Sequence, residues 1–242
     1  MHSDINLTIT PDTKLSGIIF SNPYAMLCVE HLNICMPLHE KTIREVCEEK
    51  KISLSVFLTF LNLYSGSKYV PKEPFEFDDI HVIVDYLKSS HNYYLGEIYP
   101  RILSTIREMN EINTHKEVAL VEKFFETYIS EVREHLDYED SIVFPYILEL
   151  LNQKAHYNGP MSVSQYSVEE YREHHDDIEE KLDDLKNLII KYLPGSNDSI
   201  QRRKLLLSLY ELDYDLKIHS QIEDLILIPL VAKMEAYLNK VK

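Results

Sequence analysis

The sequence is poor in glycine and cysteine. Five glycines occur in 242 residues, beside many Leu, Ile, Glu and Lys, and this composition favours an all-helical chain over a β-rich one. The three cysteines, Cys28, Cys35 and Cys47, form an odd number without a CxxC pair. They argue against a disulfide scaffold and are typical of a reducing compartment. We therefore expect an all-helical protein located in the cytoplasm.

Long apolar runs and positive charge are also scarce. No stretch is apolar enough to span a bilayer, and the polar start of the chain does not resemble a signal peptide. Lys and Arg number 25 against 40 Asp and Glu, and the net charge of −15 divides into −1 before residue 75 and −14 after it. Such an acidic body argues against nucleic-acid and membrane partners and favours the approach of cations.

One short motif is written twice. It consists of His, Glu, Asp and Pro at relative positions 0, 4, 5 and 10, and its copies begin at His135 and His219. Residues four apart on a helix share one face, with Cβ atoms roughly 5–6 Å apart. The His and Glu of each copy, the latter being Glu139 and Glu223, can therefore bind one metal centre from a single helix.

Each copy is preceded by a further histidine 44 residues upstream, His91 before the first and His175 before the second. Corresponding residues of the two halves are thus 84 positions apart. Two helical hairpins that each supply two His and one Glu would form a four-helix bundle with a dinuclear metal site inside. The predicted metal ligands are His91, His135, Glu139, His175, His219 and Glu223.

Apolar residues at intervals of three and four predict four long helices. The first covers about 78–109, the second 115–152, the third follows a loop at 156–164 and runs to about 192, and the fourth begins near 199. All six predicted ligands lie on the core-facing stripe of their helix, as a buried site requires. At 1.5 Å per residue, His91 and His135 both lie about 27–30 Å from the turn that joins their helices.

The stripe of the second helix also contains Ile142, after His135 and Glu139. Pro100, close to Gly96, predicts a kink or a weakened turn just past His91, and Pro145 predicts a bend in the second helix.

A buried carboxylate without a partner is very costly, so two Glu and four His at one level require cations or a dense hydrogen-bond network. The competing interpretation is a polar core layer that binds no metal. It requires that the two copies of the motif and the two upstream histidines share one register by coincidence. Imidazole with carboxylate suits iron, manganese or zinc, and two bridging Glu would hold the ions roughly 3.5–4 Å apart. Six protein ligands do not saturate two octahedral ions, so positions remain for an oxo bridge, O₂, NO, peroxide or water.

The two copies, each His-x-x-x-Glu followed by a proline, resemble the hemerythrin-like (HHE) cation-binding domain. The chain as a whole resembles the RIC family (repair of iron centres), di-iron proteins that repair iron–sulfur clusters damaged by nitrosative or oxidative stress. The resemblance implies an antiparallel four-helix bundle over residues 75–242, preceded by a small helical N-terminal domain over 1–70. It also implies two iron ions with oxo and carboxylate bridges, held by the six predicted ligands.

The resemblance further implies partners. Iron–sulfur proteins would be the clients, O₂, NO or peroxide the small ligands, and a homodimer is compatible with it. In the N-terminal region, family members usually carry two adjacent cysteines. Here Cys35 is followed by Met36 at the place of the second thiol, and Cys47 fits a later family position.

Short helices are expected in this N-terminal region. Asn22-Pro23 can start one helix, residues 38–50 form another, and Ser53 can cap a third over 54–63. Residues 66–79, with two prolines, are the predicted linker to the bundle.

Three functions are compatible with such a centre. The first is repair of iron–sulfur clusters by iron donation or NO handling. The second is O₂ or NO binding or sensing; hemerythrins that carry O₂ use five His, whereas four His leave both metals accessible. The third is an NO or peroxide reductase, for which the sequence shows no flavin or rubredoxin-type electron donor.

Several other residues are set aside. His175 is preferred to His174 because it is in phase with the apolar stripe, and His115 is assigned to the surface or to a helix start. Tyr94 and Tyr171, one turn from His91 and His175, are predicted to be packing residues with a satisfied hydroxyl. His81 is excluded because it lies close to three turns before His91 on the same helix, and His2, His31, His39 and His156 carry no pattern.

Overall fold

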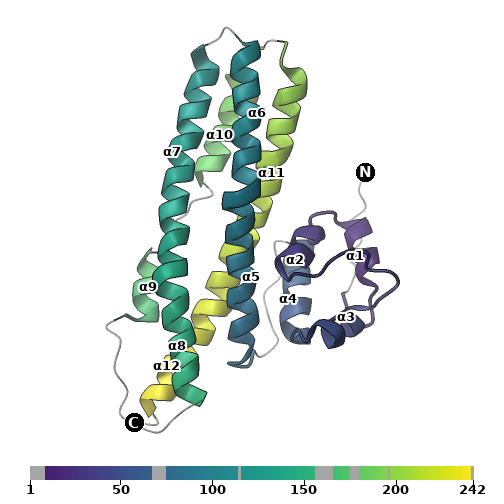
Figure 1. Cartoon of the computed structure of the whole chain (residues 1–242), viewed down its shortest axis with the longest axis vertical. Helices are drawn as coiled ribbons and strands as arrows, with labels where there is room; N and C mark the ends of the chain where they lie inside the picture. The colour runs from purple at the N-terminus through teal and green to yellow at the C-terminus, as the bar shows by residue number, and fades with distance from the viewer. Residues whose placement is uncertain are drawn as a thin grey trace.

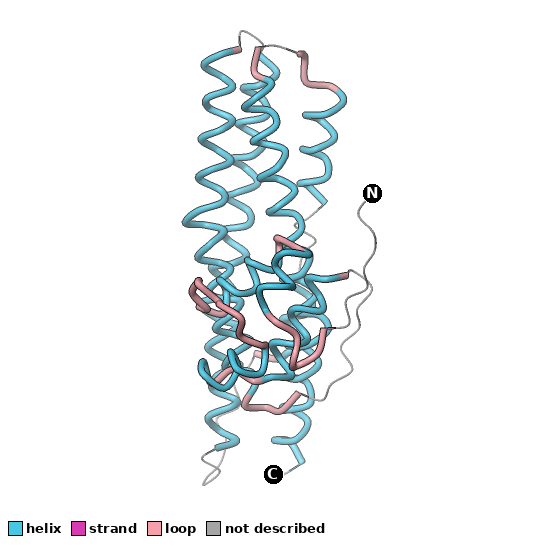
Figure 2. Tube along the Cα trace, turned by 90° about the vertical axis from the view of Figure 1, so that its right-hand side faces the viewer, coloured by secondary structure: helices cyan, strands magenta, loops and turns pink. Residues whose placement is uncertain are grey.

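The structure, a computed structural model, describes residues 9–66, 75–113, 116–155, 166–174, 180–195 and 197–240. All regular elements among these residues are helices, and no strand occurs among them (Figure 2). Long helices run side by side along one axis, and a group of short helices lies against their flank (Figure 1). The expectation of an all-helical chain is confirmed for the described residues.

The short helices come first in the chain. They are α1 (Leu15–Ser21), α2 (Ala25–His31), α3 (Ile43–Lys50) and α4 (Leu54–Ser65). The prediction that a helix begins at residue 38 was wrong, because a capping box starts α3 at Ile43. The Thr42 hydroxyl accepts the Glu45 N–H at 3.3 Å, and the Glu45 carboxylate accepts the Thr42 N–H at 2.8 Å, which satisfies two otherwise unpaired donors. Ser53 stands before α4 as predicted, but its side chain makes no capping hydrogen bond.

The first, second and fourth long helices correspond to predicted ones, with their ends moved by a few residues, whereas the predicted third helix is described only as two shorter helices. The first is α5 (Asp79–Tyr93), η1 (Tyr94–Ile98) and α6 (Tyr99–Ile112). The second is α7 (Lys116–Tyr138), η2 (Glu139–Val143) and α8 (Phe144–Ala155). The third contributes α9 (Val168–His174) and α10 (Glu180–Lys191). The fourth is α11 (Ser199–Ile222), η3 (Glu223–Leu227) and α12 (Ile228–Lys240).

The elements η1, η2 and η3 are single π-helical turns inserted into continuous helices. In each of them the residue after the turn donates its N–H to the carbonyl five positions back, and a proline follows: Pro100, Pro145 and Pro229. Proline has no N–H to donate, and its ring clashes with the carbonyl four residues back. The prolines thus account for these three π turns, where the sequence predicted kinks at the first two.

A π turn changes which residues face the core, and this corrects one prediction. Ile142 was expected on the buried stripe, but its exposed fraction is 44%, whereas the next residue, Val143, is fully buried. The turn η2 inserts one residue relative to an α-helix, so the apolar face is taken up one position later. Glu139 is the first residue of η2 and is fully buried.

The core is divided by a polar layer. One apolar cluster contains Leu87 and Val143 together with side chains of the short helices, and a second contains Tyr94, Leu136 and Leu216. His91 lies in sequence between Leu87 and Tyr94, at the boundary between the two clusters. The buried polar side chains of His91, Glu139, His219 and Glu223 therefore interrupt the apolar packing of the long helices.

The short helices pack on the long ones through α2 and α4, which contact α5, and α4 also contacts α11. The rings of Tyr24 and Tyr214 stack with centroids 4.6 Å apart across this contact. Most of the predicted linker at 66–79 lies outside the described residues, and the division into two domains stays a prediction. Among the residues that the structure covers, no helix combines the length and the apolar character needed to cross a membrane.

Candidate metal centre

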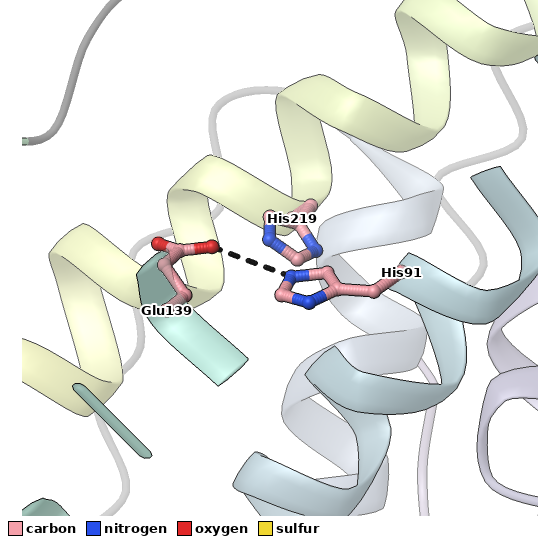
Figure 3. A group of neighbouring side chains, drawn as sticks. All are labelled: His91, Glu139 and His219. Atoms are coloured by element: carbon pink, nitrogen blue, oxygen red, sulfur yellow. Dashed lines mark ion pairs between the residues drawn. The ribbon is translucent and has the colours of Figure 1, made fainter. Parts of the chain in front are cut away.

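Three buried side chains from three separate elements converge at this level. His91 comes from α5, Glu139 from η2 and His219 from α11, and one donor atom of each lies within 4.8 Å of the others (Figure 3). Their exposed fractions are 1%, 0% and 3%. These residues are 128 positions apart at the extremes of the sequence, so the helical packing alone brings them together.

The tautomer of His219 follows from its contact with Ser90. The Ser90 hydroxyl donates to the Leu87 carbonyl at 2.7 Å and lies 2.9 Å from His219 Nδ1. A serine hydroxyl has one proton to donate. Its oxygen must therefore accept a proton from His219 Nδ1, and the lone pair of the imidazole is on Nε2, which faces the centre.

His91 is held by carboxylates on both sides of its ring. Its Nδ1 lies 3.2 Å from Asp140 Oδ1, and its Nε2 lies 3.3 Å from Glu139 Oε2. Burial lowers the pKa of His91, but Asp140 and Glu139 outweigh burial and raise the pKa from 6.5 to about 9. The ring of Phe144 stacks on the imidazole with centroids 5.6 Å apart and closes one face of it.

The inner atoms of the three residues could hold a cation between them. His91 Nε2, His219 Nε2 and Glu139 Oε2 are buried and have no hydrogen-bond partner among the described residues. With a neutral imidazole at each position, two nitrogen lone pairs and a carboxylate oxygen face one another without a proton. Unpaired buried polar atoms of this kind are costly. A proton on His91 relieves the conflict in part, and a metal ion satisfies all three atoms, so this donor set fits a metal.

The other predicted ligands lie around this group to different extents. His135 Nε2 is 3.4 Å from Glu139 Oε1, and the His135 side chain is 12% exposed. Glu223 is buried, and its Oε2 lies 3.5 Å from His219 Nε2. His175 lies outside the described residues, so its predicted role stays a prediction.

Both carboxylates present their two oxygens in different directions. Glu139 Oε2 faces His91, and Glu223 Oε2 faces His219. The Tyr171 hydroxyl has one proton to donate and gives it to Glu223 Oε1 at 2.6 Å, while Glu139 Oε1 lies 3.1 Å from the same hydroxyl oxygen. Each carboxylate therefore has one oxygen toward an imidazole and the other toward the Tyr171 hydroxyl.

Tyr171 is thus closer to the centre than its sequence context suggested. It is 2% exposed, and burial together with Glu139 and Glu223 raises its pKa well above the usual value, so the phenol keeps its proton. The prediction of a packing residue with a satisfied hydroxyl was correct, but it did not include the contact with Glu139 and Glu223. The signal that could have revealed the contact was its position one turn before a predicted ligand on the same stripe.

Sequence reasoning missed a second buried polar group. Asp215, one turn before His219 on α11, accepts from His31 Nε2 at 2.9 Å, from Tyr94 at 2.8 Å and from Tyr64. Burial raises the pKa of Asp215, but His31 and the phenols outweigh it and hold the pKa below the usual value. His31 and Tyr64 belong to the short helices, so a buried carboxylate of the long helices is satisfied largely from across the contact between them.

A histidine expected to be irrelevant to the centre is found apart from it. His81 is exposed on α5, and His115 lies outside the described residues.

Comparison of the chain with models of known protein families and with curated proteins found no match. The described residues define the class of the protein: their regular elements are all helices, and they contain a buried His and Glu group that could hold a metal ion.

Proposed function

We propose that the protein is a hemerythrin-like di-iron protein whose two ions are bridged by Glu139 and Glu223. The observation that carries the proposal is the convergence of unpaired acceptor atoms from His91, His219 and Glu139 in a buried layer. Imidazole with carboxylate suits iron, and the opposed oxygens of the two Glu suit a bridge between two ions. His135 and His175 complete the proposed ligand set of four His and two Glu, within an antiparallel four-helix bundle.

The function that we infer for this centre is the repair of iron–sulfur clusters damaged by nitrosative or oxidative stress, by iron donation or NO handling. Its support is the resemblance of the doubled motif to the RIC family and the open positions that six ligands leave on two ions. The acidic body, with a net charge of −15 for the chain, favours the approach of ferrous ions. Iron–sulfur proteins are the proposed clients, and a cytoplasmic location is part of the proposal.

The test is whether the bound iron can be transferred. The protein is loaded with ferrous ion without air, exposed to air, reduced again, and mixed with a ferrous chelator while the visible spectrum is followed. Rapid oxidation to a stable state, with iron that the chelator removes after re-reduction, is the expected result. In parallel, the loaded protein should supply iron for cluster formation on an apo iron–sulfur protein given sulfide, and zinc-loaded protein is the matched control.

The competing function is O₂ or NO binding or sensing, and the same experiment separates it. A carrier retains both ions through repeated cycles of binding and release. A long-lived oxygenated form that releases O₂ under vacuum, without any loss of iron, would overturn the repair function. A preparation that holds one tightly bound zinc ion and no iron would overturn the di-iron centre itself.

A further inference from the structure

The oxygens of the two buried carboxylates define two halves of the centre. On one side, Glu139 Oε2 is 3.3 Å from His91, and Glu223 Oε2 is 3.5 Å from His219. We call this side, with its two imidazoles, the imidazole half. On the other side lie both Oε1 atoms, with His135 3.4 Å from that of Glu139.

The second side contains a phenol, and we call it the phenol half. The Tyr171 hydroxyl lies 3.1 Å from Glu139 Oε1 and 2.6 Å from Glu223 Oε1, so one side chain contacts both carboxylates. The two Glu come from η2 and η3, and Tyr171 comes from α9. The phenol therefore links three separate elements at the level of the centre.

The imidazole half differs at the corresponding sequence position. The two halves of the sequence correspond at an offset of 84, and the residue 84 positions before Tyr171 is Leu87. Leu87 is fully buried and belongs to the apolar core. The approximate symmetry of the ligand set is thus broken at one position, where one half of the chain has a hydrogen-bond donor and the other an aliphatic side chain.

We propose that Tyr171 is a positioning residue that holds Glu139 and Glu223 in the bridging orientation and makes the two metal positions unequal. The proposal rests on the di-iron function proposed above and adds a role for a residue outside the ligand set. A phenol that donates to Glu223 Oε1 at 2.6 Å and contacts Glu139 Oε1 at 3.1 Å limits rotation of both carboxylates and leaves their Oε2 atoms directed at His91 and His219. The ion of the phenol half then depends on the donated hydrogen bond, because the Oε1 atoms that would bind it are the atoms that Tyr171 orients.

The expected loss of metal affinity can be taken from other residues that orient metal ligands. Loss of such a partner lowers metal affinity by about 10–100-fold. Tyr171→Phe removes the hydroxyl and keeps the ring, so the packing of α9 against the core is retained. We expect the dissociation constant of the weaker ferrous ion to rise by about 10–100-fold and that of the tighter ion to stay as in the wild type.

The experiment is an anaerobic titration of metal-free protein with ferrous ion against a chromophoric chelator, which yields two dissociation constants. The matched control is Tyr99→Phe, because Tyr99 is a buried tyrosine of the second apolar cluster, away from the centre. Circular dichroism of each metal-free variant checks that the helices are retained. The control should leave both constants unchanged, which separates an effect at the centre from a loss of core packing.

Three results would overturn the proposal. In the first, Tyr171→Phe leaves both constants unchanged. In the second, it weakens both ions by the same factor, as a general loss of structure would. The third is a tyrosinate-to-iron charge-transfer band in the ferric wild-type protein that Tyr171→Phe abolishes, because the phenol would then be a ligand without a proton to donate. A wild-type protein that fails to bind two ions refutes the di-iron function before any variant is compared, so the two failures are distinguishable.

Discussion

In the metal-free protein, we predict that His91 carries a proton in the place that a metal ion would take. Burial opposes the charge on the ring, but Asp140 and Glu139 outweigh burial and raise the pKa of His91 from 6.5 to about 9. At pH 7.5 the ring is therefore protonated, with one N–H toward each carboxylate. A metal ion that binds Nε2 must displace this proton.

The same pKa sets how the stability of the metal-free protein depends on pH. A group whose pKa is higher in the folded state stabilises the fold fully below its unfolded pKa, and this contribution is lost as the pH rises through the folded value. For His91 the window runs from 6.5 to about 9. Each pKa unit corresponds to about 1.4 kcal/mol, so the contribution of His91 to the free energy of unfolding is about 3 kcal/mol below the window.

Two measurements check this prediction. Urea unfolding of the metal-free protein between pH 6 and pH 9.5 should show a fall in the free energy of unfolding that His91→Gln removes. The exposed His81 on the same helix supplies the control, and His81→Gln should keep the fall. Calorimetric titration with ferrous ion at pH 7.5, in buffers of different ionisation enthalpy, should show about one proton released from His91 on binding.

Protonation of His91 is refuted if the free energy of unfolding depends on pH in the same way in the metal-free wild type and in His91→Gln. It is also refuted if metal binding to the wild-type protein at pH 7.5 releases no proton. Either result would mean that the ring is neutral in the metal-free centre and that Glu139 and Asp140 do not hold a charge on it.

Two further predictions concern the other buried carboxylates. Glu139→Ala or Glu223→Ala should each remove a bridge and most of the bound metal in elemental analysis, whereas His81→Ala should leave the metal content intact; full retention in both Glu variants would contradict the bridging role. Asp215→Ala should lower the free energy of unfolding in urea by about 3–5 kcal/mol, because it leaves His31 and two phenols without their shared acceptor. The exposed Asp85→Ala is its control, and a loss equal to that of the control would contradict the role of Asp215.

The helical architecture could be predicted because it depends on local patterns. Intervals of three and four between apolar residues located the long helices to within a few residues, and scarce glycine argued for helices throughout. The register across a proline could not be predicted in this way. The π turn η2 moved the buried position from Ile142 to Val143, because the missing N–H of Pro145 changes the hydrogen bonds of the preceding turn.

The candidate site was predictable for the related reason that its motif repeats within single helices. His135 and Glu139 lie within one helix. Together with the second copy of the motif and the upstream histidines, they predicted a site that includes His91, Glu139 and His219. The residues that support these three were different. Ser90 sets the tautomer of His219, and Asp140 faces His91, although neither residue type is unusual on a helix.

The sequence by itself thus determined the all-helical class of the described fold and predicted His91, Glu139 and His219, which form a group that could hold a metal ion, because helical periodicity and ligand spacing are properties of neighbouring positions. Only the tertiary structure decided that Tyr171 links both carboxylates and that His31 pairs with Asp215, 184 positions away. Such contacts depend on how separate helices pack against one another. Periodicity states which face of a helix is buried, but not which side chain of another helix lies opposite to it.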